Sequence, residues 1–353
     1  MSHDNEKRRI IRGAPRIIIP RFKFVDVPVA IRLGIQGWFE LEAVGPHYGI
    51  VRRRAAWAQH ITDQGLDIML GVNLGGSSFS RVEVGTGNDP ITDATTSLTN
   101  GIAVSSNKLS ETYSLNPNPP PYHCTTTRVF EFGQGTFNND NLAEVAIGSG
   151  LGLDPINVQC GDLIRDSNGN PTSFPVAPDE ILRVTHRLRI YIPGAVSDID
   201  GGSISITGSG THDVVIRALS TGVASAWTSA STIGLSTGAS GAASATAYET
   251  DILAPITANN PSGPSKTRDS ATSFSTTAGT FFRDWEVSWG LDSANNFDGG
   301  IGSIAWGLNG LNAPFTERRH FQASFNPKID KFAGGVQRIL TIQGRISLAR
   351  VSS

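Results

Sequence analysis

Residues that commonly carry out chemistry are scattered through this sequence of 353 residues, and none stands in a familiar catalytic spacing. The HExxH, GxSxG, Walker and zinc-finger patterns do not occur. The seven histidines lack the spacing of zinc ligands and stand at positions 3, 47, 60, 123, 186, 212 and 320. We therefore expect no bound metal, no cofactor and no enzymatic activity.

Cys124 and Cys160 are the two cysteines, too few for a disulfide scaffold or a cysteine-based zinc site. Two buried free thiols are the interpretation we favour, and a single disulfide is the alternative. His123 precedes Cys124 directly, so in an extended chain the two side chains point to opposite faces and form a poor nucleophile pair. His186 falls on the apolar face of an expected strand, and we expect a core histidine there.

Tryptophans and carboxylates occur together between residues 281 and 310. Aromatic rings beside acids are typical of sugar-binding surfaces, which makes Trp285, Trp289 and Trp306 candidates for contact with a glycan. Strand alternation offers a second interpretation, with Trp285 pointing inward and Glu286 outward. Polysaccharide cleavage by these acids is a third and weaker hypothesis.

Glycines at 85 and 87 invite comparison with a phosphate-binding loop. They follow a strand-like segment, but no third glycine, Lys-Ser/Thr pair or long helix comes after them. We interpret this segment as a strand that runs into a glycine turn.

Composition favours an all-β fold. The chain has 39 glycines and 19 prolines, 17% charged residues and 39% hydrophobic residues, which suits short strands joined by many turns. The formal net charge of −2 gives no general attraction to nucleic acid or to a membrane surface. No apolar run is long enough to span a membrane, and the first residues lack a signal-peptide core, so we expect synthesis in the cytoplasm.

Period-two alternation predicts most of the strands. Residues 38–44 and 50–57 flank a Gly-Pro turn and predict a hairpin. Thr62 or Asp63 is expected to cap a short helix with Leu66, Met69 and Leu70 on one face. The further expected strands are 82–87, 125–132, 142–147, 162–165, 181–192, 281–289, 303–306, 320–325 and 340–348.

The first 23 residues are basic, with seven Lys and Arg against two acids. A solvated tail is one interpretation, and the one we pursue is an arm that docks on another protein. Nucleic acid is a weaker alternative, because no aromatic residue precedes Phe22 to stack on bases. The expected docking residues are Arg8, Arg9, Arg12, Arg16, Ile17, Ile18 and Ile19.

Arg183, Arg187 and Arg189 lie on one face of the expected strand at 181–192. Arginines on an exposed sheet face commonly pair with carboxylates across the sheet, and here they are also candidates for ion pairs between subunits. We divide the chain into an arm at 1–30, a β-sandwich domain at 31–195 and a second β-rich domain at 196–353. Residues 201–280 are rich in Ser, Thr and Gly and are expected to form an insertion that packs between subunits or stays mobile.

Several segments together resemble the structural proteins of tailed bacteriophages. The "N-x-I-x-D-x-G-L" segment of that group corresponds to residues 59–66, with Gln59 in place of the usual Asn, and its "V-G-T-G" turn to residues 84–87. The resemblance covers about residues 35–195 and is weaker over 281–350. Its other landmarks are residues 38–44, 51–57, 61–67, 89–98, 141–148, 166–171 and 177–191.

This resemblance implies a non-enzymatic, oligomeric virion component of the tail or its appendages, made in the host cytoplasm. Identical subunits and other tail or connector proteins are the implied partners. One alternative is a fibre or tip protein that binds host-surface glycan, and another is a capsid or collar decoration protein. We expect neither nucleic acid nor a membrane among the partners.

Overall fold

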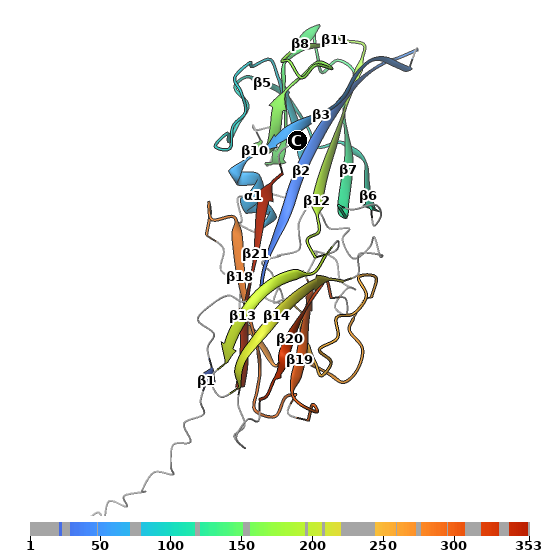
Figure 1. Cartoon of the computed structure of the whole chain (residues 1–353). Coiled ribbons are helices and arrows are strands. Elements are labelled where there is room, and N and C mark those ends of the chain that lie inside the picture. Colours follow the sequence, from blue (N-terminus) through green and yellow to red (C-terminus); the bar gives the residue numbers. More distant parts are fainter. Residues whose placement is uncertain are drawn as a thin grey trace, which may run out of the picture.

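A computed structural model gives the arrangement of most of the chain (Figure 1). The residues that it describes are 21–22, 29–47, 49–70, 79–116, 121–150, 156–194, 197–206, 209–219, 244–258, 260–272, 277–294, 296–307, 319–331 and 339–351. Within them the fold is all-β with one short helix, as the composition predicts.

Nine antiparallel strands form the curled sheet of one half of the molecule (Figure 1). In spatial order they are β6 (Lys108–Asn116), β7 (His123–Phe132), β12 (Ile181–Tyr191), β2 (Val29–Gly45), β3 (Gly49–Ile61), β10 (Asn157–Leu163), β9 (Glu144–Ser149), β4 (Arg81–Gly85) and β5 (Gly101–Ser105). The sheet curls until Ser105 at the end of β5 donates a 2.6 Å hydrogen bond to the carbonyl oxygen of Glu131 in β7. A separate pair, β8 (Asp140–Leu142) with β11 (Phe174–Val176), lies beside it.

The other half packs two sheets face to face. One sheet extends from β2 through β21 (Ile339–Arg350), β18 (Phe282–Trp289) and β17 (Ser270–Thr272), and β1 (Arg21–Phe22) pairs with β21. Trp285 of this sheet lies against Trp306 of the opposite sheet, with 5.5 Å between ring centroids. The opposite sheet contains β13 (Ile199–Ile206), β14 (Gly210–Ala218), β20 (Phe321–Ile329), β19 (Ile301–Gly307), β15 (Ser244–Tyr248) and β16 (Ser265–Thr267).

The 17-residue strand β2 joins the two halves. Its residues 34–44 pair with β12, residues 37–45 pair with β3, and residues 29–35 pair in parallel with β21. Every second side chain of β2 is buried along this length, from Ile31 to Ala43. One continuous alternating pattern therefore supplies apolar side chains to the cores of both halves.

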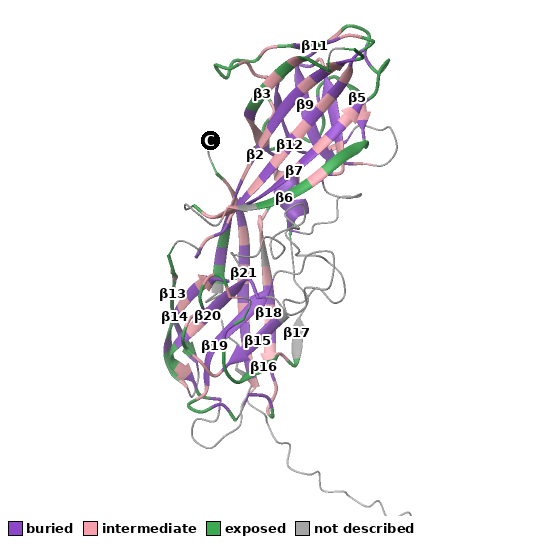
Figure 2. Ribbon diagram, turned by 90° about the vertical axis from the view of Figure 1, so that its right-hand side faces the viewer, coloured by how far each residue is buried: buried purple, intermediate pink, exposed green. Residues whose placement is uncertain are grey.

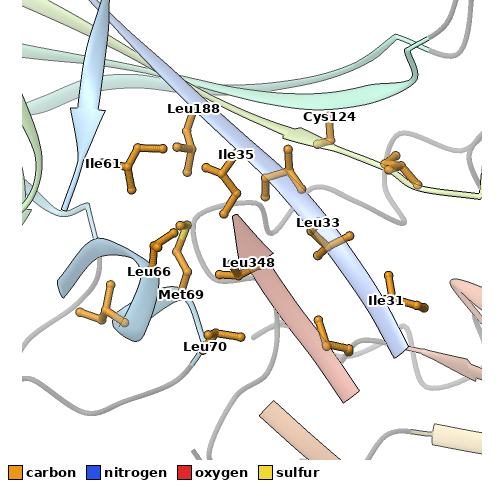
Figure 3. Close-up of a cluster of buried hydrophobic side chains, with 14 of the residues drawn as sticks. Ile31, Leu33, Ile35, Ile61, Leu66, Met69, Leu70, Cys124, Leu188 and Leu348 are labelled. Carbon is orange, nitrogen blue, oxygen red and sulfur yellow. The ribbon is translucent and has the colours of Figure 1, made fainter. Parts of the chain in front are cut away.

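Helix α1 (Asp63–Met69) lies where the two halves meet, as Figure 3 shows. Thr62 is the N-cap and accepts a hydrogen bond from the Gly65 N–H at 3.1 Å. Leu66 and Met69 point toward Ile35 of β2 and Leu348 of β21 (Figure 3). The predicted cap and apolar face of this helix are confirmed.

The chain departs from the sequence-based expectations in two places. The strand expected at 320–325 is longer in the structure, because β20 continues through Asn326 and Pro327 to Ile329. Within the expected insertion, β13 (Ile199–Ile206) and β14 (Gly210–Ala218) pair antiparallel in the six-stranded sheet, so this part is a structural element. The domain boundary at 195 stays a prediction; it falls between β12 and β13, while β2 contributes strand pairing to both halves.

Replacing Gly65 by Ala tests how closely α1 must approach β10. A Cβ at this position would lie 2.1 Å from the carbonyl oxygen of Gln159. Helix propensity alone predicts that Ala stabilises the protein by about 1 kcal/mol. The clash predicts instead a loss of about 1–3 kcal/mol in the free energy of unfolding. Chemical denaturation measures the sign.

The matched control is Gly133→Ala, where a Cβ meets nothing within 4 Å. Its free energy of unfolding should change by less than about 0.5 kcal/mol. A stabilised Gly65→Ala variant would contradict this close packing of helix on strand.

Candidate functional site

The predicted docking residues Arg8, Arg9, Arg12, Arg16 and Ile17 to Ile19 lie outside the described residues. The described chain starts at β1, where Arg21 and Phe22 pair in parallel with Ile339 and Leu340 of β21. The docking arm stays a prediction.

The three arginines of β12 point to the outer face of the curled sheet and have partners within the chain. Arg183 Nε donates to Glu131 Oε2 at 3.0 Å, and Arg187 Nη2 donates to Glu40 Oε2 at 2.9 Å. The guanidinium of Arg189 lies 4.5 Å from the ring centroid of Trp38. Pairing with carboxylates across the sheet is confirmed for Arg183 and Arg187, while ion pairs with another subunit stay a prediction.

Glu40 is the centre of the charges on this face. It receives hydrogen bonds from Arg187 and from Arg53 of β3, the latter through Nε at 2.7 Å. Burial by itself would raise the pKa of Glu40, but the hydrogen bonds from the two arginines outweigh it and hold the pKa below 4.5. Glu40 thus holds three neighbouring strands together as an ionised carboxylate.

Trp285, Trp289 and Trp306 are buried, with exposed fractions of 2%, 0% and 0%. Their rings form the contact between the two sheets of the second half, and Trp289 Nε1 donates to the carbonyl oxygen of Lys266 at 3.0 Å. The expectation that they contact a glycan is therefore wrong, and the alternation interpretation, with Trp285 inward, is confirmed. The alternation of tryptophans and carboxylates is therefore that of a strand with one buried face and one outward face.

Strand β6 is an open edge of the curled sheet: among the described residues it pairs only with β7. It is largely solvent-exposed, as Figure 2 shows, and two of its larger apolar side chains, Leu109 and Tyr113, are 47% and 41% exposed. Its charged residues Lys108 and Glu111 pair with each other. We call β6, on the side away from β7, the open edge.

A chain of polar side chains leads from the open edge into the core. Glu111 accepts a 2.9 Å hydrogen bond from Nε of Arg128, whose side chain is 1% exposed. Phe79 covers Arg128 and also stacks on His186, with 5.7 Å between the ring centroids. His186 is fully buried, and its Nε2 lies 2.9 Å from Gln59 Nε2.

The prediction of a core histidine is confirmed for His186. Burial, together with the nearby charge of Arg128, lowers the pKa of His186 well below its usual value, so the ring is neutral at pH 7. The sequence did not predict that Arg128 is buried, because its position depends on the pairing of β7 with β12 and on Phe79, which lies in a distant segment.

The glycine turn after β4 is held by a carboxylate rather than by a phosphate. The backbone N–H groups of Gly87, Asn100 and Thr99 donate to Glu144 at 3.0, 2.8 and 3.1 Å. Glu144 is 1% exposed, so these donors face inward. Sequence analysis missed Glu144, although Gly85 and Gly87 signalled that something approaches the backbone closely; a Cβ on either would lie within 2.5 Å of Glu144 Oε1.

Cys124, Cys160 and Lys331 are buried groups that could in principle act as nucleophiles. Both cysteines are free and buried, which confirms the favoured interpretation, and burial raises the pKa of Cys124 to about 12. Burial lowers the pKa of Lys331 to about 8, and its amine donates to the carbonyl oxygen of Gly290 at 2.6 Å. Within the described ranges, no three His, Cys, Asp or Glu side chains gather closely enough to hold a metal ion.

Comparison of the chain with known protein families, with characterised proteins and with solved structures finds no match. The part of the chain that is described contains no helix with the length and hydrophobicity needed to cross a membrane. Functional inference therefore depends on the geometry of the open edge and on the sequence pattern.

Replacing Glu40 by Gln tests the charge network of the outer face. The variant should lose about 1–2 kcal/mol of unfolding free energy at pH 7, because two charge-assisted hydrogen bonds weaken. Since the pKa of Glu40 is lowered in the folded state, its contribution is present above the ordinary value of 4.5 and disappears as the pH falls through the folded-state pKa. Urea unfolding at a series of pH values should show a difference between the two proteins at pH 7 that persists down to the ordinary value of 4.5 and shrinks only at lower pH.

Glu42→Gln is the control, because this carboxylate lies on the same strand and face but contacts Arg53 only at 3.5 Å. It should cost less than Glu40→Gln at pH 7. An equal loss in both variants, or a Glu40→Gln deficit that does not change with pH, would contradict the central role of Glu40.

Proposed function

We propose that this protein is a non-enzymatic structural subunit of a tailed-phage virion, in the tail or a tail appendage, that assembles with copies of itself and docks on neighbouring tail or connector proteins. The observation that carries the proposal is the open edge at β6, where Leu109 and Tyr113 are exposed on a strand that, among the described residues, pairs only with β7. The phage-like sequence segments and the basic arm support it.

An open edge is unusual in a protein that works alone. Soluble proteins protect edge strands with prolines, bulges or charges, because an exposed row of N–H and C=O groups pairs with other strands. β6 contains no proline, its register shift against β7 lies at the start of the strand between Lys108 and Ser110, and its charges Lys108 and Glu111 are engaged with one another and with Arg128. The remaining surface, with a formal net charge of only −2 over the whole chain, offers little repulsion between copies.

Leu109→Lys tests assembly through the open edge. A lysine placed among exposed apolar residues of an edge strand opposes pairing with a second strand, so the dissociation constant of self-association should rise about tenfold or more. Sedimentation velocity over a concentration series measures this shift, and thermal unfolding checks that the variant remains folded.

The control for this variant is Ile252→Lys, because Ile252 is 75% exposed but lies outside the strands, after β15. It should assemble like the wild type. If both lysines weaken assembly equally, or if neither does, the open edge is not the assembly surface.

Deleting residues 1–20 tests the docking arm while keeping β1. The truncated protein should keep its thermal midpoint within about 2 °C, since an arm that docks on another protein contributes little to the isolated fold. In phage particles grown with the truncated copy, we expect the protein to be absent from the purified virion. Quantitative mass spectrometry of purified particles gives the occupancy.

A second variant, with Arg8, Arg9, Arg12 and Arg16 changed to Gln, separates the basic residues from Ile17 to Ile19. Reduced occupancy in this variant assigns docking to charge, and normal occupancy assigns it to the isoleucine run. Normal occupancy of the truncated protein would show that the arm is not a docking element.

A further inference from the structure

Strand β6 is the longer of the two edges of the curled sheet. It has nine residues, whereas β5 at the other edge has five. Among the described residues β6 pairs only with β7, and its exposed side faces away from the sheet (Figure 2). The longer edge therefore offers a partner strand more backbone, and the strand pairing determines how that partner can bind.

The hydrogen bonds around β7 show which residues of β6 face outward. Glu131 N–H donates to the Asn107 carbonyl oxygen, and Ile192 N–H donates to the Tyr122 carbonyl oxygen, both at 3.0 Å. Because backbone groups alternate in direction along an antiparallel strand, the odd-numbered residues of β7 face β6 and the even-numbered residues face β12. The residues of β6 opposite those odd-numbered positions are 110, 112, 114 and 116. Positions 111, 113 and 115 therefore turn their N–H and C=O groups to the open edge.

This alternation limits how two copies of β6 can pair antiparallel about a two-fold axis. Outward-facing residues must lie opposite outward-facing residues, which requires the axis to pass through a residue rather than between two. An axis through Thr112 places position 108 opposite position 116 and uses the whole strand. An axis through Glu111 or Tyr113 leaves two residues of the strand beyond the pairing.

Charge selects among the same registers. An axis through Glu111 would place its carboxylate directly opposite the same carboxylate of the second copy, which is destabilising. An axis through Thr112 places each Glu111 opposite Tyr113 of the second copy instead. Within its own chain Glu111 is already paired with Lys108 and Arg128. The two Lys108 residues then lie eight positions apart along the paired strands, about 27 Å, and do not repel one another strongly.

We propose that two copies of this chain join through antiparallel pairing of β6 with β6, with the two-fold axis at Thr112. The two curled sheets then continue into one another, and the exposed side chains of Leu109 and Tyr113 lie at the interface. Because the same surface is used on both copies, the contact closes at two chains instead of extending into a filament. This inference rests on the proposed function and adds to it the partner strand and the register.

A cysteine at the two-fold axis tests the register in the full chain. Thr112 is exposed, and in this register it lies opposite itself in a non-hydrogen-bonded pair, with a Cα–Cα distance of about 4.5 Å. That distance is within the range that a disulfide spans. Thr112→Cys treated with oxidised glutathione should therefore form a covalent dimer, seen by non-reducing electrophoresis. The wild type should not cross-link, because Cys124 and Cys160 are buried.

Ser110→Cys and Ser114→Cys are the matched controls, since both residues are exposed and lie on the same face of β6 as Thr112. Each lies four positions from its own copy across the axis, about 14 Å, which is too far for a disulfide. Position 110 lies opposite position 114, so a mixture of the two variants should cross-link. Thr112→Cys should react about tenfold or more faster than either control alone, because pairing raises the effective concentration of its thiols.

Light scattering of the reduced wild type separates this inference from the proposed function. A multimer whose Thr112→Cys variant does not cross-link contradicts the two-fold pairing of β6 and leaves self-assembly intact. A mass of one chain at every concentration contradicts self-assembly, and the pairing with it. Cross-linking of Ser114→Cys alone as fast as Thr112→Cys indicates random collision or a different register and also overturns the proposal.

Discussion

The two halves of this protein depend on one strand. β2 hydrogen-bonds to β12, β3 and β21, and the first and last of these pairings join residues more than 130 and 300 positions apart in the chain. Because side chains on one face of β2 are buried along its whole length, neither half can open without exposing the apolar face of the other. We expect the halves to unfold together rather than as independent domains, with α1 packed at the junction (Figure 3).

Two buried carboxylates, Glu144 and Asp67, stabilise segments of this fold through backbone N–H groups. Glu144 fixes a glycine turn through three backbone N–H groups, and Asp67 of α1 accepts from the Gly279 N–H at 3.0 Å and ties the helix to the segment before β18. Burial raises the pKa of Asp67, and the hydrogen bond from the Gly279 N–H offsets part of this effect. Such a framework suits a protein whose work is done at its surface, where the open edge at β6 and the arginine face of β12 lie.

Local pattern predicted much of the fold and little of the site. Alternation located the hairpin of β2 and β3, and the cap at Thr62 located α1, since both signals lie within a few neighbouring residues. No local sequence pattern predicts the pairing of β2 with β21, because the two strands are separated by almost the whole chain. Long-range packing also explains why Trp306 was interpreted as a binding residue. Its burial depends on the contact between two sheets, which the local sequence does not show. The contacts of Arg128 could not be predicted either, because its partners come from three separate segments.

Self-assembly is the property on which the proposed function depends, and static light scattering of the purified full chain measures it directly. The account predicts a defined multiple of the 37.5 kDa chain mass that persists on dilution through the micromolar range and without residues 1–20. A mass of one chain at every concentration, with and without those residues, would contradict a self-assembling subunit.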